Sequence, residues 1–164
     1  MVKLETKAPG YLDTLLLYFE EEIMGEAYFL GLTDHFDDPG QRDKLTLLAQ
    51  VERHAAEAVR PLLHKYDLSP RSDKELKPLG EAWMERHTSW DWGELVKDMS
   101  VRYQGYVDDF ERLENMAPSE DLPALKILTD HEVVAIEFAN REIAGDPMSS
   151  EPLRRYLASP VTCT

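Results

Sequence analysis

The sequence predicts an all-α protein: a bundle of four long helices with a long connection between the second and the third. Apolar residues recur at the three- and four-residue spacing of one helix face through four long segments. No segment alternates steadily between apolar and polar residues, as a half-buried strand does. The chain also resembles itself at an offset of 80 residues, which aligns Gly25 with Gly105. Its 164 residues suit a single domain spanning residues 1–164.

The internal repeat aligns residues 12–60 with residues 92–140, and each copy has the pattern of a helical pair. Five aligned pairs lie within the second predicted helix of each copy. They are Leu45/Leu125, Leu48/Leu128, Glu52/Glu132, Ala55/Ala135 and Glu57/Glu137. The repeat therefore predicts two helical hairpins related by pseudo-two-fold symmetry. The alternative is a chance match, because any two amphipathic helix pairs align with some agreement.

The first hairpin is predicted to comprise helices over residues 11–36 and 41–66. The break between them is Asp37-Asp38-Pro39-Gly40, a run that disfavours continued helix. Pro61 lies within the second pattern, so it should kink the last turns or end the helix early. The predicted stripe of the first helix is Leu12, Leu16, Phe19, Ile23, Glu26, Leu30 and Thr33.

The second hairpin is predicted to comprise helices over residues 89–116 and 122–144. Thr88 or Ser89 would cap the first of these, and Pro123 suits the first turn of the other. The segment before this hairpin, residues 67–91, is too long for a tight turn and is typical of a crossover connection. Two short helices are also expected, at residues 73–87 and 150–158.

Each copy of the repeat places a glutamate in the middle of an apolar stripe. Glu26 lies about ten residues before the end of its helix, and Glu52 about twelve after the start of the next. At ~1.5 Å per residue both lie roughly 15–18 Å from the connecting loop, at one level of the bundle. The same count brings Tyr106 and Glu132 together, which predicts one polar layer of Glu26, Glu52, Tyr106 and Glu132.

Burying these carboxylates is costly unless a metal ion, a proton or a counter-charge neutralises them. Arg102 is a candidate counter-charge, because it lies one turn before Tyr106 and aligns with Glu22 in the repeat. A Glu22–Arg102 pair, or Arg102 reaching the layer, would then replace a metal. Protonated carboxylates and a small-molecule pocket are the remaining alternatives.

The pattern resembles the ferritin-like superfamily over about residues 12–143. The segments that carry the resemblance are Gly25-Glu26-Ala27-Tyr28-Phe29 and Val51-Glu52-Arg53-His54-Ala55-Ala56-Glu57. Such bundles have a long crossover and typically hold two metal ions, usually iron. A glutamate from each of two helices and Glu-x-x-His from each of the other two supply the ligands. The resemblance implies a ferritin-like up-down four-helix bundle with a carboxylate-rich metal site.

The sequence departs from that motif at three ligand positions. Ala55 and Ala135 stand where the two histidines belong, and Tyr106 stands in place of the third-helix glutamate. The standard di-iron site is therefore altered. Of the nearby histidines, His54 points away from Glu52, whereas His131 flanks Glu132. The candidate ligands for iron or manganese are Glu26, Glu52, Glu132, Tyr106 and His131.

Two functional hypotheses follow from the layer of glutamates. One is a carboxylate-rich metal-binding or oxidoreductase-like protein that acts on oxygen or peroxide. The other is a non-catalytic bundle, a binding or protein-interaction module with a metal-free, salt-bridged core. No glycine-rich phosphate loop, Cys-x-x-Cys pair or nucleophile elbow supports another chemistry.

The composition of the chain limits the classes of binding partner that we expect. The net charge of −14 repels nucleic-acid backbones and anionic membranes. No stretch has the length of a membrane span, and the start of the chain lacks the apolar core of a signal peptide. Cys163 is the sole cysteine, which excludes an intramolecular disulfide and fits a cytoplasmic protein. A homodimer is expected as the commonest soluble assembly.

Overall fold

The computed structural model describes residues 10–160, and this part of the chain is helical without a strand, which confirms the all-α class. Cys163 lies outside the described residues. No helix in residues 10–160 is both long and apolar enough to cross a membrane. The helices are α2 (Tyr11–Leu32), α3 (Pro39–Lys65), α4 (Asp73–Met84), α5 (Trp92–Met116), α6 (Leu122–Ile143) and α7 (Glu151–Leu157), with short 3-10 turns η1 (Thr33–His35), η2 (Glu85–His87) and η3 (Ser119–Asp121).

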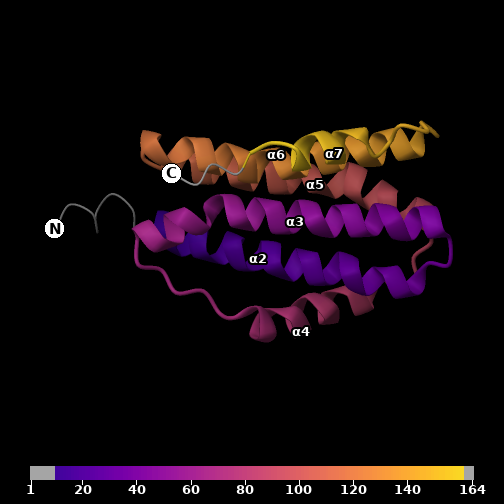
Figure 1. Ribbon diagram of the computed structural model, residues 1–164, viewed down its shortest axis with the longest axis horizontal. Helices are drawn as coiled ribbons and strands as arrows, with labels where there is room; N and C mark the ends of the chain where they lie inside the picture. Colours follow the sequence, from indigo (N-terminus) through magenta and orange to yellow (C-terminus); the bar gives the residue numbers. More distant parts are fainter. Residues whose placement is uncertain (1–9, 161–164) are drawn as a thin grey trace.

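The four long helices lie side by side (Figure 1). Helix α2 packs on α3, α5 packs on α6, α3 also packs on α6, and α2 contacts α5, so the four close a ring. The crossover between α3 and α5 contains α4, which packs against α2, and α7 lies against α6 and α3. Two hairpins and a long crossover are thus present in the chain order that the sequence predicts.

Local capping decides where the helices begin. Pro39 begins α3 behind Asp38, whose carboxylate accepts the Gln41 backbone N–H. Asp91 forms a capping box with Glu94, so α5 begins at Trp92 and not near residue 89 as predicted. Pro61 lies inside α3, and the helix continues past it to Lys65. The prediction that Pro61 could end this helix early is therefore wrong.

Helix α2 is buried on more than one side, and this changes its predicted stripe. Leu30 of that stripe is 46% exposed, whereas Glu22 and Phe29 are buried. The reason is α4, which covers part of α2 at very close range: a Cβ on Gly80 would lie 2.2 Å from the backbone oxygen of Met24. Only glycine at position 80 permits this approach, and a helix covered on two sides has no single apolar stripe.

Two apolar clusters fill the ring of helices, and on α3 and α6 buried polar residues lie between them. One cluster includes Phe29, Leu48, Met99 and Phe138, and the other includes Leu15, Val59, Leu113 and Leu125. On α3 the first cluster ends at Val51 and the second begins at Ala55, with Glu52 between. On α6 they are separated in the same way around His131 and Glu132. Two of the four residues predicted for a central polar layer, Glu52 and Glu132, therefore lie at one level between the apolar clusters.

Candidate metal centre

Four potential ligands from three helices meet in this layer. Glu22 lies on α2, Glu52 on α3, and His131 and Glu132 on α6, and none is more than 6% exposed. One ligand atom from each lies within 4.8 Å of the other three. The Nε2 atom of His131 is 2.7 Å from Glu22 Oε2, 3.1 Å from Glu132 Oε1 and 3.4 Å from Glu52 Oε2. Three carboxylates therefore surround one imidazole nitrogen.

The imidazole is oriented by its own helix. Nδ1 of His131 hydrogen-bonds the backbone oxygen of Leu128, one turn earlier on α6. Because a carbonyl only accepts, Nδ1 carries the proton and Nε2 is the atom directed at the carboxylates. A histidine whose Nδ1–H is held by a carbonyl in this way is the usual form of a metal-ligating histidine.

The position of Glu52 depends on a glycine. A Cβ on Gly25 would lie 2.7 Å from Oε2 and 2.9 Å from Cδ of Glu52. These separations are shorter than van der Waals contact, so any larger residue at position 25 would displace the carboxylate. Gly25 thus gives α3 a close approach to α2 at the level of the cluster.

The cluster leaves buried polar atoms without hydrogen-bond partners. Among the described residues, Glu22 Oε2, Glu132 Oε2 and His131 Nε2 form no hydrogen bond. Glu22 Oε2 and His131 Nε2 are nevertheless only 2.7 Å apart. An orphaned buried polar atom costs about 1–3 kcal/mol, so this arrangement is unfavourable unless a cation or added protons join it.

Burial and mutual contact shift the pKa values of all four side chains. Burial raises the pKa of Glu22 well above its ordinary value and also raises the pKa of Glu132. Burial alone would lower the pKa of His131, but Glu22, Glu132 and Glu52 raise it well above its usual range. Burial acts to raise the pKa of Glu52 as well, but the neighbouring His131 and Glu22 bring it below its ordinary value.

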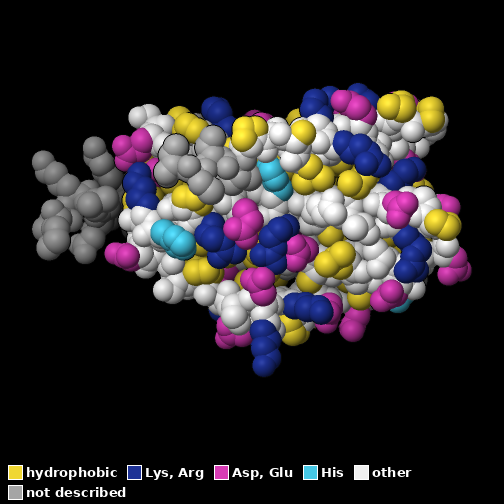
Figure 2. All heavy atoms as spheres, in the orientation of Figure 1, with side chains coloured by type: hydrophobic (Ala, Val, Ile, Leu, Met, Phe, Trp, Pro, Cys, Tyr) yellow, Lys and Arg dark blue, Asp and Glu magenta, His cyan; other side chains and the backbone are white. Residues whose placement is uncertain are grey.

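Of the predicted ligands, Glu52, Glu132 and His131 lie together, and Glu26 does not. Both oxygens of Glu26 accept from Arg53, at 2.7 and 2.8 Å, and Arg53 also donates to Asp73 at the start of α4. Figure 2 shows basic and acidic side chains interleaved on this face of the molecule. The predicted place of Glu26 in the central layer is therefore corrected: Glu22, one turn earlier, occupies it.

The predicted arginine counter-charge is also corrected. Arg102 forms its ion pair with Asp98, 3.2 Å away on the same helix, and neither Glu22 nor Glu52 is among its partners in residues 10–160. Tyr106 lines the same cavity as Glu52 and Glu132, and its role as a ligand stays a prediction. The basic side chain nearest the buried carboxylates is therefore His131.

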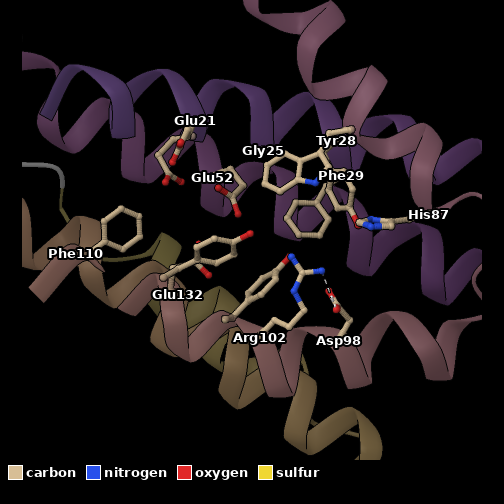
Figure 3. Close-up of a pocket in the computed structure, with 14 residues that line it drawn as sticks. Glu21, Gly25, Tyr28, Phe29, Glu52, His87, Asp98, Arg102, Phe110 and Glu132 are labelled. Atoms are coloured by element: carbon tan, nitrogen blue, oxygen red, sulfur yellow. Dashed lines mark hydrogen bonds and ion pairs between the residues drawn. The ribbon is translucent and has the colours of Figure 1, made fainter. Parts of the chain in front are cut away.

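A small cavity opens beside the cluster (Figure 3). Its volume is about 50 Å³, and it lies between α2, α3, α5, α6 and the crossover. Buried carboxylates form its inner end, and half-exposed side chains form its outer end. The lining residues are Glu21, Glu22, Gly25, Tyr28, Phe29, Glu52, Trp83, His87, Asp98, Arg102, Tyr103, Tyr106, Phe110 and Glu132.

Glu22 is the ligand candidate that sequence reasoning missed. The repeat aligned it with Arg102, which favoured an ion pair. A usable signal was present in Gly25, a glycine in the middle of an apolar helix. If Gly25 marks where Glu52 approaches α2, the facing carboxylate on α2 lies about one turn earlier, at Glu22.

Comparisons with known proteins add no assignment. No family model, no curated protein and no solved structure matches this chain. The functional argument therefore rests on the geometry of the site.

Proposed function

We propose that this protein binds one transition-metal ion, iron or manganese, through Glu22, Glu52, His131 and Glu132. The observation that carries the proposal is the convergence of three buried carboxylates and one oriented imidazole whose facing atoms lack hydrogen-bond partners. A protein interior rarely leaves so many polar atoms orphaned in one place. A metal ion at the centre would bond all of them at once.

The ligand set fits these metals in type and charge. Carboxylate oxygen and imidazole nitrogen are ligands that iron and manganese accept, and no thiolate is present to favour a softer ion. Three carboxylates and a neutral imidazole carry three negative charges, which a trivalent ion balances fully and a divalent ion nearly so. Complete neutralisation matters here because all four side chains are buried.

The architecture supports a ferritin-like protein whose metal site has fewer ligands than the family's di-iron site. Two hairpins, a long crossover and carboxylates from α2, α3 and α6 match that pattern. Helix α5 brings Tyr103 and Tyr106 to the cavity where that family has a glutamate. The proposed centre therefore holds one ion. Such an ion would supply redox chemistry, and a cavity of about 50 Å³ admits oxygen or peroxide.

The competing function is a metal-free bundle that acts by binding a partner. Its support is the close pair of Glu22 and His131, at 2.7 Å, with the pKa of both groups raised. Two protons would then neutralise most of the cluster, as in a salt-bridged core. This alternative predicts no metal in the purified protein.

Elemental analysis of protein purified without added metal tests the proposal. We expect about one equivalent of iron or manganese, and we expect Glu52→Ala to abolish binding in a metal titration. Glu57→Ala is the matched control, because Glu57 lies on the same helix but pairs with Arg60 outside the cluster. Metal-free wild type that also fails to bind added iron or manganese would favour the salt-bridged core.

A further inference from the structure

We infer that the cavity beside the cluster binds a small organic cation, a short alkylamine in its ammonium form. This inference rests on the proposed function, because the metal ion would bind the inner carboxylates and the ammonium ion would occupy the cavity beside them. Three features of the cavity carry it: the aromatic walls, an unpaired carboxylate and the volume.

The walls of the cavity are aromatic on several sides. The aromatic lining residues are Tyr28, Phe29, Trp83, Tyr103, Tyr106 and Phe110. Cations bind favourably over the faces of such rings, most strongly when water is excluded. Neighbouring contacts hold the rings: Tyr28 hydrogen-bonds Nδ1 of His87 at 2.7 Å and packs against Trp83 with centroids 5.6 Å apart. Trp83 and His87 belong to the crossover, which thus forms part of the cavity wall.

Outside the four ligands, one carboxylate of the cavity lining has no partner among the described residues. Arg102 is paired with Asp98, so the two cancel. Burial lowers the pKa of His87, which disfavours a positive charge on this imidazole. Glu21 remains: it lines the cavity and forms no hydrogen bond or ion pair with any residue in the described range 10–160. An ammonium ion would give Glu21 the partner that the protein does not provide.

An anionic ligand fits the cavity poorly. It would meet Glu21 without a compensating charge, and the only guanidinium in the lining is already paired and half in solvent. The net charge of −14 also attracts cations and repels anions at a distance. A volume of about 50 Å³ accommodates roughly three to five non-hydrogen atoms, judged by the space a water molecule needs. Propylammonium has this size and charge.

Propylammonium, propan-1-ol and propionate form a matched set of probes with the same carbon chain. Their binding is measured by ligand-observed NMR on protein loaded with zinc, a diamagnetic substitute for iron or manganese. We expect propylammonium to bind and the other two to bind at least tenfold more weakly. Glu21→Gln should weaken propylammonium binding roughly tenfold, and Trp83→Leu about threefold to tenfold. Glu111→Gln is the control, because it removes the same charge from an exposed site on α5.

Equal or tighter binding of propionate or propan-1-ol overturns the inference, as does propylammonium binding that Glu21→Gln leaves unchanged. Elemental analysis of the same samples separates this failure from failure of the proposed function. Protein that binds metal but no propylammonium disproves the inference alone. Protein that binds propylammonium through Glu21 but never binds metal disproves the metal centre and supports the cation cavity. Manganese-loaded protein should in addition broaden the propylammonium resonances, because the ion lies at the inner end of the cavity.

Discussion

Two buried carboxylate sites in this molecule are built in opposite ways. Near one end of the bundle, Asp121 is 1% exposed and accepts three hydrogen bonds. Tyr11 donates at 2.7 Å, Tyr66 at 2.6 Å and Lys65 at 2.6 Å. At the centre, three buried glutamates share a single imidazole, that of His131, and several atoms have no hydrogen-bond partner.

The number of hydrogen-bond donors for each carboxylate distinguishes the two sites. Asp121 is fully satisfied by side chains of the protein, so it ties α2, α3 and the start of α6 together and needs no ligand. The central cluster has more acceptors than donors, so an added cation stabilises it. Burial of acidic groups alone would not separate these two cases.

The largest expected effect sharpens this comparison within α2. Glu22→Gln should weaken iron or manganese binding more than a thousandfold, because it replaces an ionised ligand at a buried metal site with a neutral amide. Glu26→Gln, one turn away, should leave metal affinity unchanged within about twofold, since Glu26 is paired with Arg53. Isothermal titration with the two variants measures both effects.

The assignment of Glu22 as the ligand on α2 would be contradicted if Glu26→Gln weakened metal binding more than Glu22→Gln. Loss of metal binding in Glu26→Gln with normal binding in Glu22→Gln would place the metal between α2 and α4. Circular dichroism of each variant checks that the helices are intact before the comparison is made.

The second effect concerns the satisfied carboxylate. Asp121→Asn should lower the free energy of unfolding by about 2–4 kcal/mol, because it removes a charge that three donors surround and leaves Lys65 without its buried partner. Metal affinity should not change. Chemical denaturation of the two proteins measures the difference, and a loss below about 0.5 kcal/mol would show that the three hydrogen bonds contribute little.

The contribution of Asp121 should also depend on pH. Burial acts to raise its pKa, but hydrogen bonds from Lys65, Tyr66 and Tyr11 bring the pKa below the ordinary 3.8. A carboxyl group whose pKa is lower in the folded state stabilises the fold above its unfolded pKa, and loses that contribution as the pH falls through the folded value. The stability difference between wild type and Asp121→Asn should therefore be full at pH 6 and shrink below pH 4. A constant difference from pH 6 to pH 2 would contradict this assignment.

Much of the fold follows from the sequence, because helix boundaries depend on local chemistry. On α3 the residues aligned by the repeat lie as predicted: Leu45, Leu48 and Ala55 are buried, with Glu52 among them. The buried face of α2 was harder to predict, because apolar residues lie all around this helix and α4 covers a second side of it. Which of two buried sides faces the other long helices is a tertiary property, and periodicity does not report it.

The part of the candidate site on α3 and α6 could be predicted from the sequence, and the part on α2 could not. Glu52 and Glu132 lie on helices with one buried face, so the stripe places them in the central layer. His131 follows from its position next to Glu132. Glu26 and Glu22 lie one turn apart on α2, and a count of helical rise has an error of about one turn when the loop geometry is unknown. The choice between them required the packed structure.

The smallest expected effect tests the two glycines that the internal repeat aligns. Gly105 is exposed on α5, and a Cβ there would meet no atom within 4 Å, so Gly105→Ala should raise the free energy of unfolding by about 0.5–1 kcal/mol through helix propensity. Gly25→Ala has the same gain in propensity, but its Cβ would displace the carboxylate of Glu52. We therefore expect no stabilisation from Gly25→Ala and about tenfold weaker metal binding. Thermal denaturation and metal titration of both variants measure this difference. Equal stabilisation by the two alanines, with unchanged metal affinity, would show that Glu52 moves freely and that the close approach at Gly25 does not position the centre.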